Sequence, residues 1–430
     1  MNPLTRFFDQ VIARPWMSIS RWGTTALLTQ ALTKDSHTPQ FVPQAGTMLY
    51  VAASTLPYHI SGYTNRTQAV IRALSQAGKT VYALTRPGYP WDRPDRLQDA
   101  QETATQVEEI KYHHFRTPRN NRPVLFYTFQ AAKVIAQRAQ EQKVALIHAA
   151  SNHVNALPAL VAARSLGLPF QYEMRGLWEL TRIARQPWFK DLPAYRQGLE
   201  LEGLVARHAD RLLVISKELG EYMTIQAGVD GRRMALLPNC VHLDEFTPAH
   251  THEVESMSIG FAGSLMGYEG LDTLILAVRR LKDRGVFCTL YLIGDGEARS
   301  QLETLVRDLG LLAQVFFMGR VSPKTARQYL ERVALICLPR KPYTVCHIVP
   351  PIKLVEALAM GKPVVVSDLP VFRSEAPHGT LFFTAGNDEH LAEVLDKALA
   401  DQEALVALGQ AGRNYVQKYR LWARFMSNLL

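Results

Sequence analysis

The sequence predicts an α/β protein with two doubly wound, Rossmann-like domains. Short β-rich runs alternate with helical stretches of about a dozen residues, which is the pattern of βαβ units. The alternation stops once near the middle of the chain and then resumes. The 430 residues, with 47% hydrophobic and 20% charged side chains, suffice for two full-sized hydrophobic cores. This composition excludes disordered and collagen-like proteins.

The first half of the chain predicts an open parallel sheet covered by helices on both faces. The expected strands are residues 47–52, 80–85, 144–148, 170–173 and 211–215. The expected helices are residues 65–76, 154–166 and a helix that starts at Ser216, a residue type favoured at the N-cap.

A second βαβ series follows a break rich in proline and polar residues, which predicts an interdomain linker. Its expected strands are residues 258–262, 288–293, 315–318, 334–338 and 364–367, and its expected helices are 271–284, 297–309, 323–332, 352–360 and a closing helix at 415–430. The predicted organisation is an N-terminal extension at 1–45, a first domain at 46–238, a linker at 239–256, a second domain at 257–413 and a C-terminal helix at 414–430.

Charge and cysteine content narrow the classes of partner. The net charge of +9 favours anionic partners such as sugar nucleotides or phospholipid surfaces. Nucleic acid is not expected, because the basic residues do not cluster with aromatic ones. The four cysteines lie far apart without a CxxC pair, which argues against a zinc site and against disulfides. With no apolar run long enough to span a bilayer and no cleavable leader, a cytoplasmic protein is expected.

The first residues predict an amphipathic helix that binds a membrane surface. Apolar side chains recur at helical spacing with arginines beside them, and Pro15 is expected to end the helix. Residues 1–22 are therefore expected to attach the protein to the inner face of the cytoplasmic membrane. Docking of this helix on the first domain is the alternative. The apolar stripe consists of Leu4, Phe7, Phe8, Val11 and Ile12, and Trp16, Ile19 and Trp22 extend it.

The segment from residue 338 to 368 carries the most specific signal in the chain. A helix is expected to start after Pro350 and Pro351, with Lys353 in its first turn and Glu356 one turn later. A helix N-terminus with an added cation can bind a diphosphate, and a carboxylate one turn on can accept hydrogen bonds from ribose hydroxyls. A surface Lys–Glu pair is the alternative interpretation.

At this point the sequence resembles the retaining GT-B glycosyltransferases of group 1, or family 4, in particular the bacterial subgroup of exopolysaccharide and lipopolysaccharide assembly. The resemblance extends from about residue 47 to the end of the chain. It rests on segments 61–66 (SGYTNR), 172–179 (YEMRGLWE), 238–248, 260–272 (GFAGSLMGYEGLD) and 292–296 (LIGDG), together with 350–368.

The resemblance implies transfer of a sugar from a nucleotide-sugar donor, with UDP as the expected nucleotide, to a glycan or lipid-linked acceptor. The fold implied is GT-B, in which two domains face each other across a cleft. No cofactor and no metal are expected, because helix N-termini and cationic side chains stabilise the leaving diphosphate.

The roles implied for single residues fall into three groups. Catalytic roles are expected for His148, His153, Arg340 and Lys353, of which Arg340 and Lys353 would hold the diphosphate in the solvent-facing cleft. Donor binding is expected for Glu356, Gly263, Ser264, Arg320, Val321, Leu354 and Gly62. Arg175, Arg66 and Glu269 are expected elsewhere in the cleft, although Arg175 could instead pair with Glu179.

Several positions depart from the pattern of the family. Of two glutamates spaced eight residues apart, the second is Glu356, but the first is replaced by Ile348. Ser264 and Glu269 stand where many members have Arg and Lys, and Ala150 replaces the second His of a His-x-His pair. Two alternatives therefore stay open: a catalytically impaired binding or scaffold subunit, and a nucleotide-sugar epimerase on the same fold.

Overall fold

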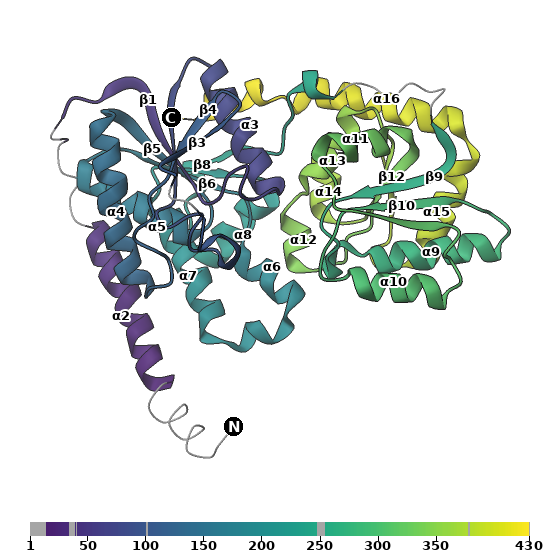
Figure 1. The fold of residues 1–430 in the computed structure, drawn as a ribbon, viewed down its shortest axis with the longest axis horizontal. Coiled ribbons are helices and arrows are strands. Elements are labelled where there is room, and N and C mark those ends of the chain that lie inside the picture. The colour runs from purple at the N-terminus through teal and green to yellow at the C-terminus, as the bar shows by residue number, and fades with distance from the viewer. Residues whose placement is uncertain are drawn as a thin grey trace. The chain divides into compact units, whose positions relative to one another are not determined.

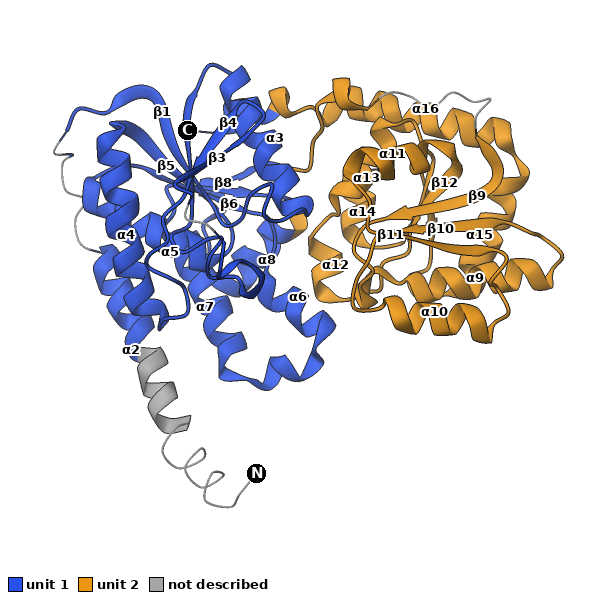
Figure 2. Cartoon of the chain, in the orientation of Figure 1, with its two compact units in different colours: residues 1–215, 219–237, 425–430 blue, residues 216–218, 238–424 orange. Residues whose placement is uncertain are grey.

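The structure is a computed structural model that describes residues 14–33, 39, 41–99, 102–246, 254–376 and 379–429, with side chains from residue 23 onward. The chain divides into two compact units (Figure 2). Unit 1 contains residues 1–215, 219–237 and 425–430, and unit 2 contains residues 216–218 and 238–424.

Unit 1 is built on an eight-stranded sheet in the order β3-β4-β2-β1-β5-β6-β7-β8. The strands are β1 (Gln44–Ala52), β2 (Thr80–Thr85), β3 (Ala104–Val107), β4 (Ile110–His113), β5 (Val144–Ala150), β6 (Phe170–Met174), β7 (Arg211–Val214) and β8 (Met234–Leu236). All neighbouring pairs are parallel except β3 and β4, which form an antiparallel pair at one edge. The expectation of an entirely parallel sheet is therefore wrong at this edge.

The helices of unit 1 pack on the two sides of this sheet, with α4 and α5 on one side and α3 on the other (Figure 1). They are α2 (Arg14–Thr33), α3 (Gly62–Gln76), α4 (Val124–Glu141), α5 (His153–Leu166), α6 (Trp178–Arg185), α7 (Pro193–His208) and α8 (Lys217–Ala227), with 3-10 turns at Pro94–Arg96, Pro187–Asp191 and Gly231–Arg233. Residues 47–52 of the central strand β1 are all buried, as expected for a strand covered on both faces.

Unit 2 repeats the plan with a six-stranded sheet in the order β11-β10-β9-β12-β13-β14, in which every pair is parallel. The strands are β9 (Glu255–Ala262), β10 (Thr289–Ile293), β11 (Val315–Gly319), β12 (Val333–Leu338), β13 (Val364–Ser367) and β14 (Thr380–Phe383). The helices are α9 (Leu271–Asp283), α10 (Arg299–Asp308), α11 (Pro323–Arg332), α12 (Thr344–Ile348), α13 (Ile352–Ala359), α14 (Pro370–Glu375), α15 (Asp388–Ala400) and α16 (Gln402–Tyr419), with 3-10 turns at Leu243–Glu245 and Gly267–Glu269.

The two ends of the chain differ from the expected elements. Pro15 lies in the first turn of α2, where its missing N–H costs no hydrogen bond, and does not end a helix there. Leu28 and Leu32 of α2 are buried, and α2 contacts α4, α5 and α7. The apolar stripe of residues 4–12 lies outside the described residues. The predicted closing helix at 415–430 is wrong, because α16 ends at Tyr419 and a 3-10 turn at Trp422–Asn428 follows.

Candidate functional site

The carboxyl edge of the sheet in unit 2 holds most of the residues predicted to bind the donor. In open parallel sheets, ligands bind outside the carboxyl ends of the strands. Gly263 directly follows β9, Gly294 directly follows β10, and Arg340 lies two residues after β12. Gly294 has a φ of +135°, and a Cβ there would lie 1.9 Å from the carbonyl oxygen of Gly263. Glycine is required at this position because the two loops touch through their backbones.

Lys353 reaches the same edge from the first turn of α13. A Cβ on Gly263 would lie 2.6 Å from the Nζ of Lys353, so the absence of a side chain at residue 263 makes room for the lysine. The Lys353 Nζ also lies 4.2 Å from the centre of the Phe261 ring, a favourable cation–π distance. The strand β9, the loop after it and α13 therefore position this ammonium group together.

Glu269 joins the two cations. Its Oε1 accepts a hydrogen bond from Arg340 Nη2 at 3.1 Å, and its Oε2 lies 3.1 Å from Lys353 Nζ. Arg340 Nη1 also donates to the carbonyl oxygen of Val349 at 2.9 Å, and the Ser367 hydroxyl donates to the carbonyl oxygen of Arg340 at 2.6 Å. The arginine is thus anchored on three sides. The two cations and one carboxylate leave this group with a net charge of +1.

The electrostatics of this group follow from its burial and charges. Burial by itself would raise the pKa of Glu269, but the charges of Arg340 and Lys353 outweigh it and lower the pKa to about 2. Burial lowers the pKa of Lys353, against the opposing effect of Glu269. Glu356, one turn further along α13, has a raised pKa because of burial.

Arg340 and Lys353 meet although 13 positions separate them, as the sequence predicted. The expectation that both face solvent is wrong: Arg340 is 9% exposed and the Lys353 side chain 18% exposed. Glu269, whose carboxylate pairs with both cations, was expected only as a cleft residue. The Leu354 side chain is 3% exposed and belongs to the core of unit 2.

The remaining residues predicted to bind the donor are Ser264, Arg320, Val321 and Gly62. Ser264 and Arg320 are exposed, and Val321 is half-buried. Arg320 directly follows β11, and Ser264 lies two residues after β9, so both also stand at the carboxyl ends of strands. Gly62 is exposed at the start of α3 in unit 1, where Ser61 caps the helix by accepting a hydrogen bond from the Thr64 N–H.

In unit 1, Glu173 is the centre of a second buried charge cluster. Arg66 Nε donates to its Oε1 at 2.8 Å, and Arg175 Nη2 donates to its Oε2 at 2.7 Å. The Tyr50 hydroxyl donates to the same Oε2 at 2.8 Å. The two guanidinium groups outweigh the effect of burial and hold the pKa of Glu173 well below its usual range. Arg175 therefore pairs with Glu173 and not with Glu179.

His148 belongs to this cluster and is not available to a substrate. The residue is 0% exposed, its ring stacks on Tyr50, and its two nitrogens lie 2.9 Å from Gln171 Nε2 and 3.3 Å from Glu173 Oε2. Burial lowers its pKa, which favours the neutral ring. The expectation of a His148 that faces the cleft is corrected, because β5 is covered on both faces at this residue. Arg66 and Arg175, at 2% and 3% exposed, are equally enclosed.

His153, the other candidate base, lies in a third cluster at the start of α5. Its Nδ1 lies 3.3 Å from Glu202 Oε1 and 3.7 Å from Glu179 Oε1. Burial and the neighbouring Glu202 raise the pKa of Glu179 to about 7. Burial lowers the pKa of His153, but the two carboxylates outweigh it and the pKa is raised. The sequence offered no signal for Glu202, which lies 49 residues from His153.

Two family matches cover most of the chain. Residues 61–240 match the family described as "Glycosyl transferase 4-like domain", and residues 244–415 match "Glycosyl transferases group 1". The chain belongs to the group 1 family of glycosyltransferases. Glu269, Arg340 and Lys353 fall within the second match. The His153 cluster and Glu173 with its two arginines fall within the first.

Two curated relatives have names that describe them as glycosyltransferases. The putative glycosyltransferase EpsF of Bacillus subtilis is 25% identical over 182 residues, which are 40% of this chain and 46% of EpsF. The lipopolysaccharide core biosynthesis glycosyltransferase LpsE of Rhizobium meliloti is 31% identical over 173 residues, which are 39% of this chain and 45% of LpsE. The chain spans about half the length of these relatives.

A solved structure shares the fold. Anabaena HepE in complex with UDP and glucose has a TM-score of 0.67 and 16% sequence identity, over 89% of this chain and 98% of HepE. At this identity the likeness concerns the fold, which is the GT-B arrangement of two Rossmann-like domains that the sequence predicted.

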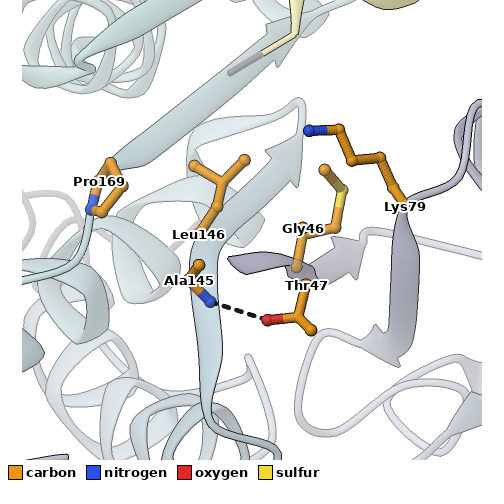
Figure 3. Close-up of a pocket in the computed structure, with 7 residues that line it drawn as sticks. Gly46, Thr47, Lys79, Ala145, Leu146 and Pro169 are labelled. Atoms are coloured by element: carbon orange, nitrogen blue, oxygen red, sulfur yellow. Dashed lines mark hydrogen bonds between the residues drawn. The ribbon is translucent and has the colours of Figure 1, made fainter. Parts of the chain in front are cut away.

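A small pocket in unit 1 lies away from these groups (Figure 3). It is lined by residues at the amino ends of β1, β2, β5 and β6, where the Thr47 hydroxyl accepts a hydrogen bond from the Ala145 N–H at 3.1 Å. Its volume of about 150 Å³ is below the roughly 300 to 1,000 Å³ of small-molecule sites. We therefore do not assign it a ligand.

None of the described helices has an apolar stretch long enough to span a bilayer.

Proposed function

We propose that the protein transfers a sugar, with retention at the anomeric carbon, from a nucleoside diphosphate sugar to a glycan or lipid-linked acceptor in bacterial surface polysaccharide assembly. One observation carries the proposal: Arg340 and Lys353 converge on Glu269 at the carboxyl edge of a parallel sheet. The family supports the reaction class, the UDP in the HepE structure supports the nucleotide, and the name of LpsE, a lipopolysaccharide core biosynthesis glycosyltransferase, supports the acceptor class.

In this mechanism the two cations stabilise the leaving diphosphate. As the bond between the sugar and the diphosphate breaks, negative charge grows on the phosphate oxygens, and fixed cations lower the free energy of that transition state. Glu269 holds both side chains in place before the donor binds, so little reorganisation is needed. Glu356 would accept hydrogen bonds from the ribose, and Arg320 with Val321 would contact the base. The acceptor would bind mainly to unit 1.

A thermal-shift screen tests the donor. We expect UDP and UDP sugars to raise the melting temperature more than GDP or ADP sugars at equal concentration. Transfer is then measured with the donor that binds, in buffer containing EDTA, because the proposal gives the metal's usual role at the diphosphate to Arg340 and Lys353. Loss of transfer in EDTA at a temperature where the protein stays folded, with recovery on adding Mg²⁺ or Mn²⁺, would contradict this mechanism.

A catalytically impaired binding subunit is the second candidate. The observation that favours it is that both cations already pair with Glu269, at a position where many members of the family carry a lysine. Hydrolysis of the donor in the absence of acceptor separates the two functions. A protein that binds UDP sugar but neither hydrolyses nor transfers it would support the binding subunit.

We further propose that residues 1–22 bind anionic membrane surfaces. The proposal rests on their apolar stripe and flanking arginines, whose apolar burial and electrostatic attraction to lipid would add. Flotation with vesicles containing anionic lipid tests it. The full chain is expected to float and a chain lacking residues 1–22 to remain in the soluble fraction, whereas equal flotation of both would refute the proposal.

A further inference from the structure

We propose that His153, Glu179 and Glu202 form a binding site for one divalent transition-metal ion, with Zn²⁺ as the reference ion. His153 is the first residue of α5, Glu179 is the second residue of α6, and Glu202 lies in α7. All three residues are buried, at 8%, 1% and 0% exposed. The site lies in unit 1 and is separate from the diphosphate site proposed in unit 2.

The spacing of the ligand atoms suits a tetrahedral ion. One nitrogen or oxygen from each residue lies within 4.8 Å of the other two. His153 Nδ1 is 3.3 Å from Glu202 Oε1 and 3.7 Å from Glu179 Oε1. Tetrahedral Zn²⁺ with bonds of about 2.0 to 2.1 Å places neighbouring ligand atoms roughly 3.3 to 3.4 Å apart. The two distances from His153 are within a few tenths of an ångström of this spacing, and the two carboxylates would close the remaining separation from at most 4.8 Å.

The charge of the cluster favours a cation. Two carboxylates face one imidazole, and among the described residues the ion pairs of Glu179 and Glu202 are with His153 alone. Glu179 Oε2 is buried and has no hydrogen-bond partner. Buried carboxylates normally pair with cations or bind a metal, and Glu173 in the same unit follows this rule with Arg66 and Arg175. In the part of the chain that the structure describes, no Arg or Lys pairs with the carboxylates of the His153 cluster, so a metal ion would supply the missing positive charge.

Neighbouring groups orient the ligands as the outer shell of a metal site does. The Tyr172 hydroxyl donates to Glu202 Oε2 at 2.6 Å, and the His153 backbone N–H donates to Glu202 Oε1 at 2.6 Å. Gly198, one turn before Glu202 on α7, leaves the space that Glu179 occupies, since a Cβ at residue 198 would lie 2.2 Å from Glu179 Oε1. A bound ion would link α5, α6 and α7, and thus stabilise this part of unit 1.

The test uses the full-length protein, stripped of metal with EDTA and dialysed. ZnCl₂ is titrated in competition with a chromogenic chelator, and Co²⁺ is added separately, because its visible spectrum reports tetrahedral coordination. We expect one equivalent of Zn²⁺ to bind and the melting temperature to rise with Zn²⁺ concentration, since ligands that bind only the folded state stabilise it.

The decisive variant is Glu179→Gln, which keeps the shape of the side chain and removes its charge. It is expected to melt in EDTA no lower than wild type and to bind Zn²⁺ more than tenfold more weakly. Glu200→Gln, an exposed change on the same helix α7, is the matched control and should bind like wild type. Tyr172→Phe keeps all three ligands and is expected to weaken binding by about tenfold, the lower limit for loss of an orienting partner.

Failure of wild-type protein to bind a stoichiometric ion would overturn the proposal and leave the cluster as a site that holds a shared proton. Equal Zn²⁺ affinity of wild type and Glu179→Gln would also overturn it, because the ion would then be bound elsewhere. If Glu179→Gln does not fold, Tyr172→Phe is compared with Glu200→Gln. Equal Zn²⁺ affinity of these two variants would overturn the proposal.

Discussion

Two groups of buried carboxylates lie near the carboxyl ends of parallel strands. One is the Glu269 group of unit 2, formed by Glu269, Arg340 and Lys353. The other is the His153 cluster of unit 1, in which Glu179 and Glu202 meet His153. In unit 2, one carboxylate meets two cations, and the pKa of Glu269 is lowered to about 2. In unit 1, two carboxylates meet one imidazole, and the pKa of Glu179 is raised to about 7. We therefore expect the two sites to attract ligands of opposite charge, because one has an excess of cations and the other an excess of carboxylates.

Charge balance also predicts how much each carboxylate contributes to stability. Glu173→Gln leaves two buried guanidinium groups without their counterion and is expected to cost roughly 3 to 5 kcal/mol of unfolding free energy. Glu179→Gln removes a poorly compensated buried charge and is therefore not expected to lower the unfolding free energy. Urea denaturation measures both at pH 7.5 in EDTA. Equal losses in the two variants would show that charge balance does not separate these clusters.

Removing a cation from the Glu269 group is expected to have a similarly large effect on catalysis. Lys353→Ala and Arg340→Ala should each lower turnover about a hundredfold to a thousandfold, which corresponds to a rise of roughly 3 to 4 kcal/mol in the activation free energy. Each change removes a fixed positive charge that stabilises the leaving diphosphate. Steady-state kinetics with the donor identified by thermal shift measure this. Arg373→Ala, at an exposed pair with Asp368 in the same unit, is the control and should turn over like wild type.

The structure also changes the stability expected of these two variants. Arg340 is buried and donates to both Glu269 and the Val349 carbonyl oxygen, so Arg340→Ala should lower the melting temperature. Lys353 is more exposed, and Arg340 still pairs with Glu269 when the lysine is absent, so Lys353→Ala should melt closer to wild type. If both variants turn over donor like wild type, the diphosphate is bound elsewhere.

The pH dependence of stability should have opposite signs in the two clusters. Glu269 has a lowered pKa, so its contribution is present above pH 4.5 and is lost as pH falls toward 2. Glu179 has a raised pKa, so its contribution is present below pH 4.5 and is lost as pH rises to about 7, by up to about 3 kcal/mol. In EDTA, Glu179→Gln should therefore gain stability relative to wild type between pH 5 and pH 7.5. A constant difference across that range would contradict the raised pKa.

The smallest effect is expected from Glu269→Gln on nucleotide binding. The change raises the net charge of the group from +1 to +2, and UDP is expected to bind about tenfold more tightly, or about 1.4 kcal/mol. Isothermal titration with UDP measures it, and Glu403→Gln, an exposed change on α16, serves as the control. Weaker binding by Glu269→Gln would show that the orientation provided by Glu269 matters more than its charge.

Local patterns in the chain predicted most of the elements and part of the donor site. The strands at 80–85 and 364–367 and the helix at 323–332 have the expected bounds, because apolar runs, prolines and glycines mark their ends locally. Arg340 and Lys353 were expected to meet because the carboxyl ends of parallel strands share one edge of the sheet. The antiparallel edge formed by β3 and β4 was missed, since its strands are only four residues each and carry no distinct pattern.

The sequence by itself determined which residues could bind a diphosphate, and only the tertiary structure decided how they are partnered and how far they are buried. Glu269 lies 71 positions from Arg340, and Glu202 lies 49 positions from His153, so no local pattern connects them. His148 looks the same in the sequence whether it faces solvent or lies enclosed. Its burial depends on helices that pack over both faces of β5, and long-range packing of this kind is not encoded in the spacing of neighbouring residues.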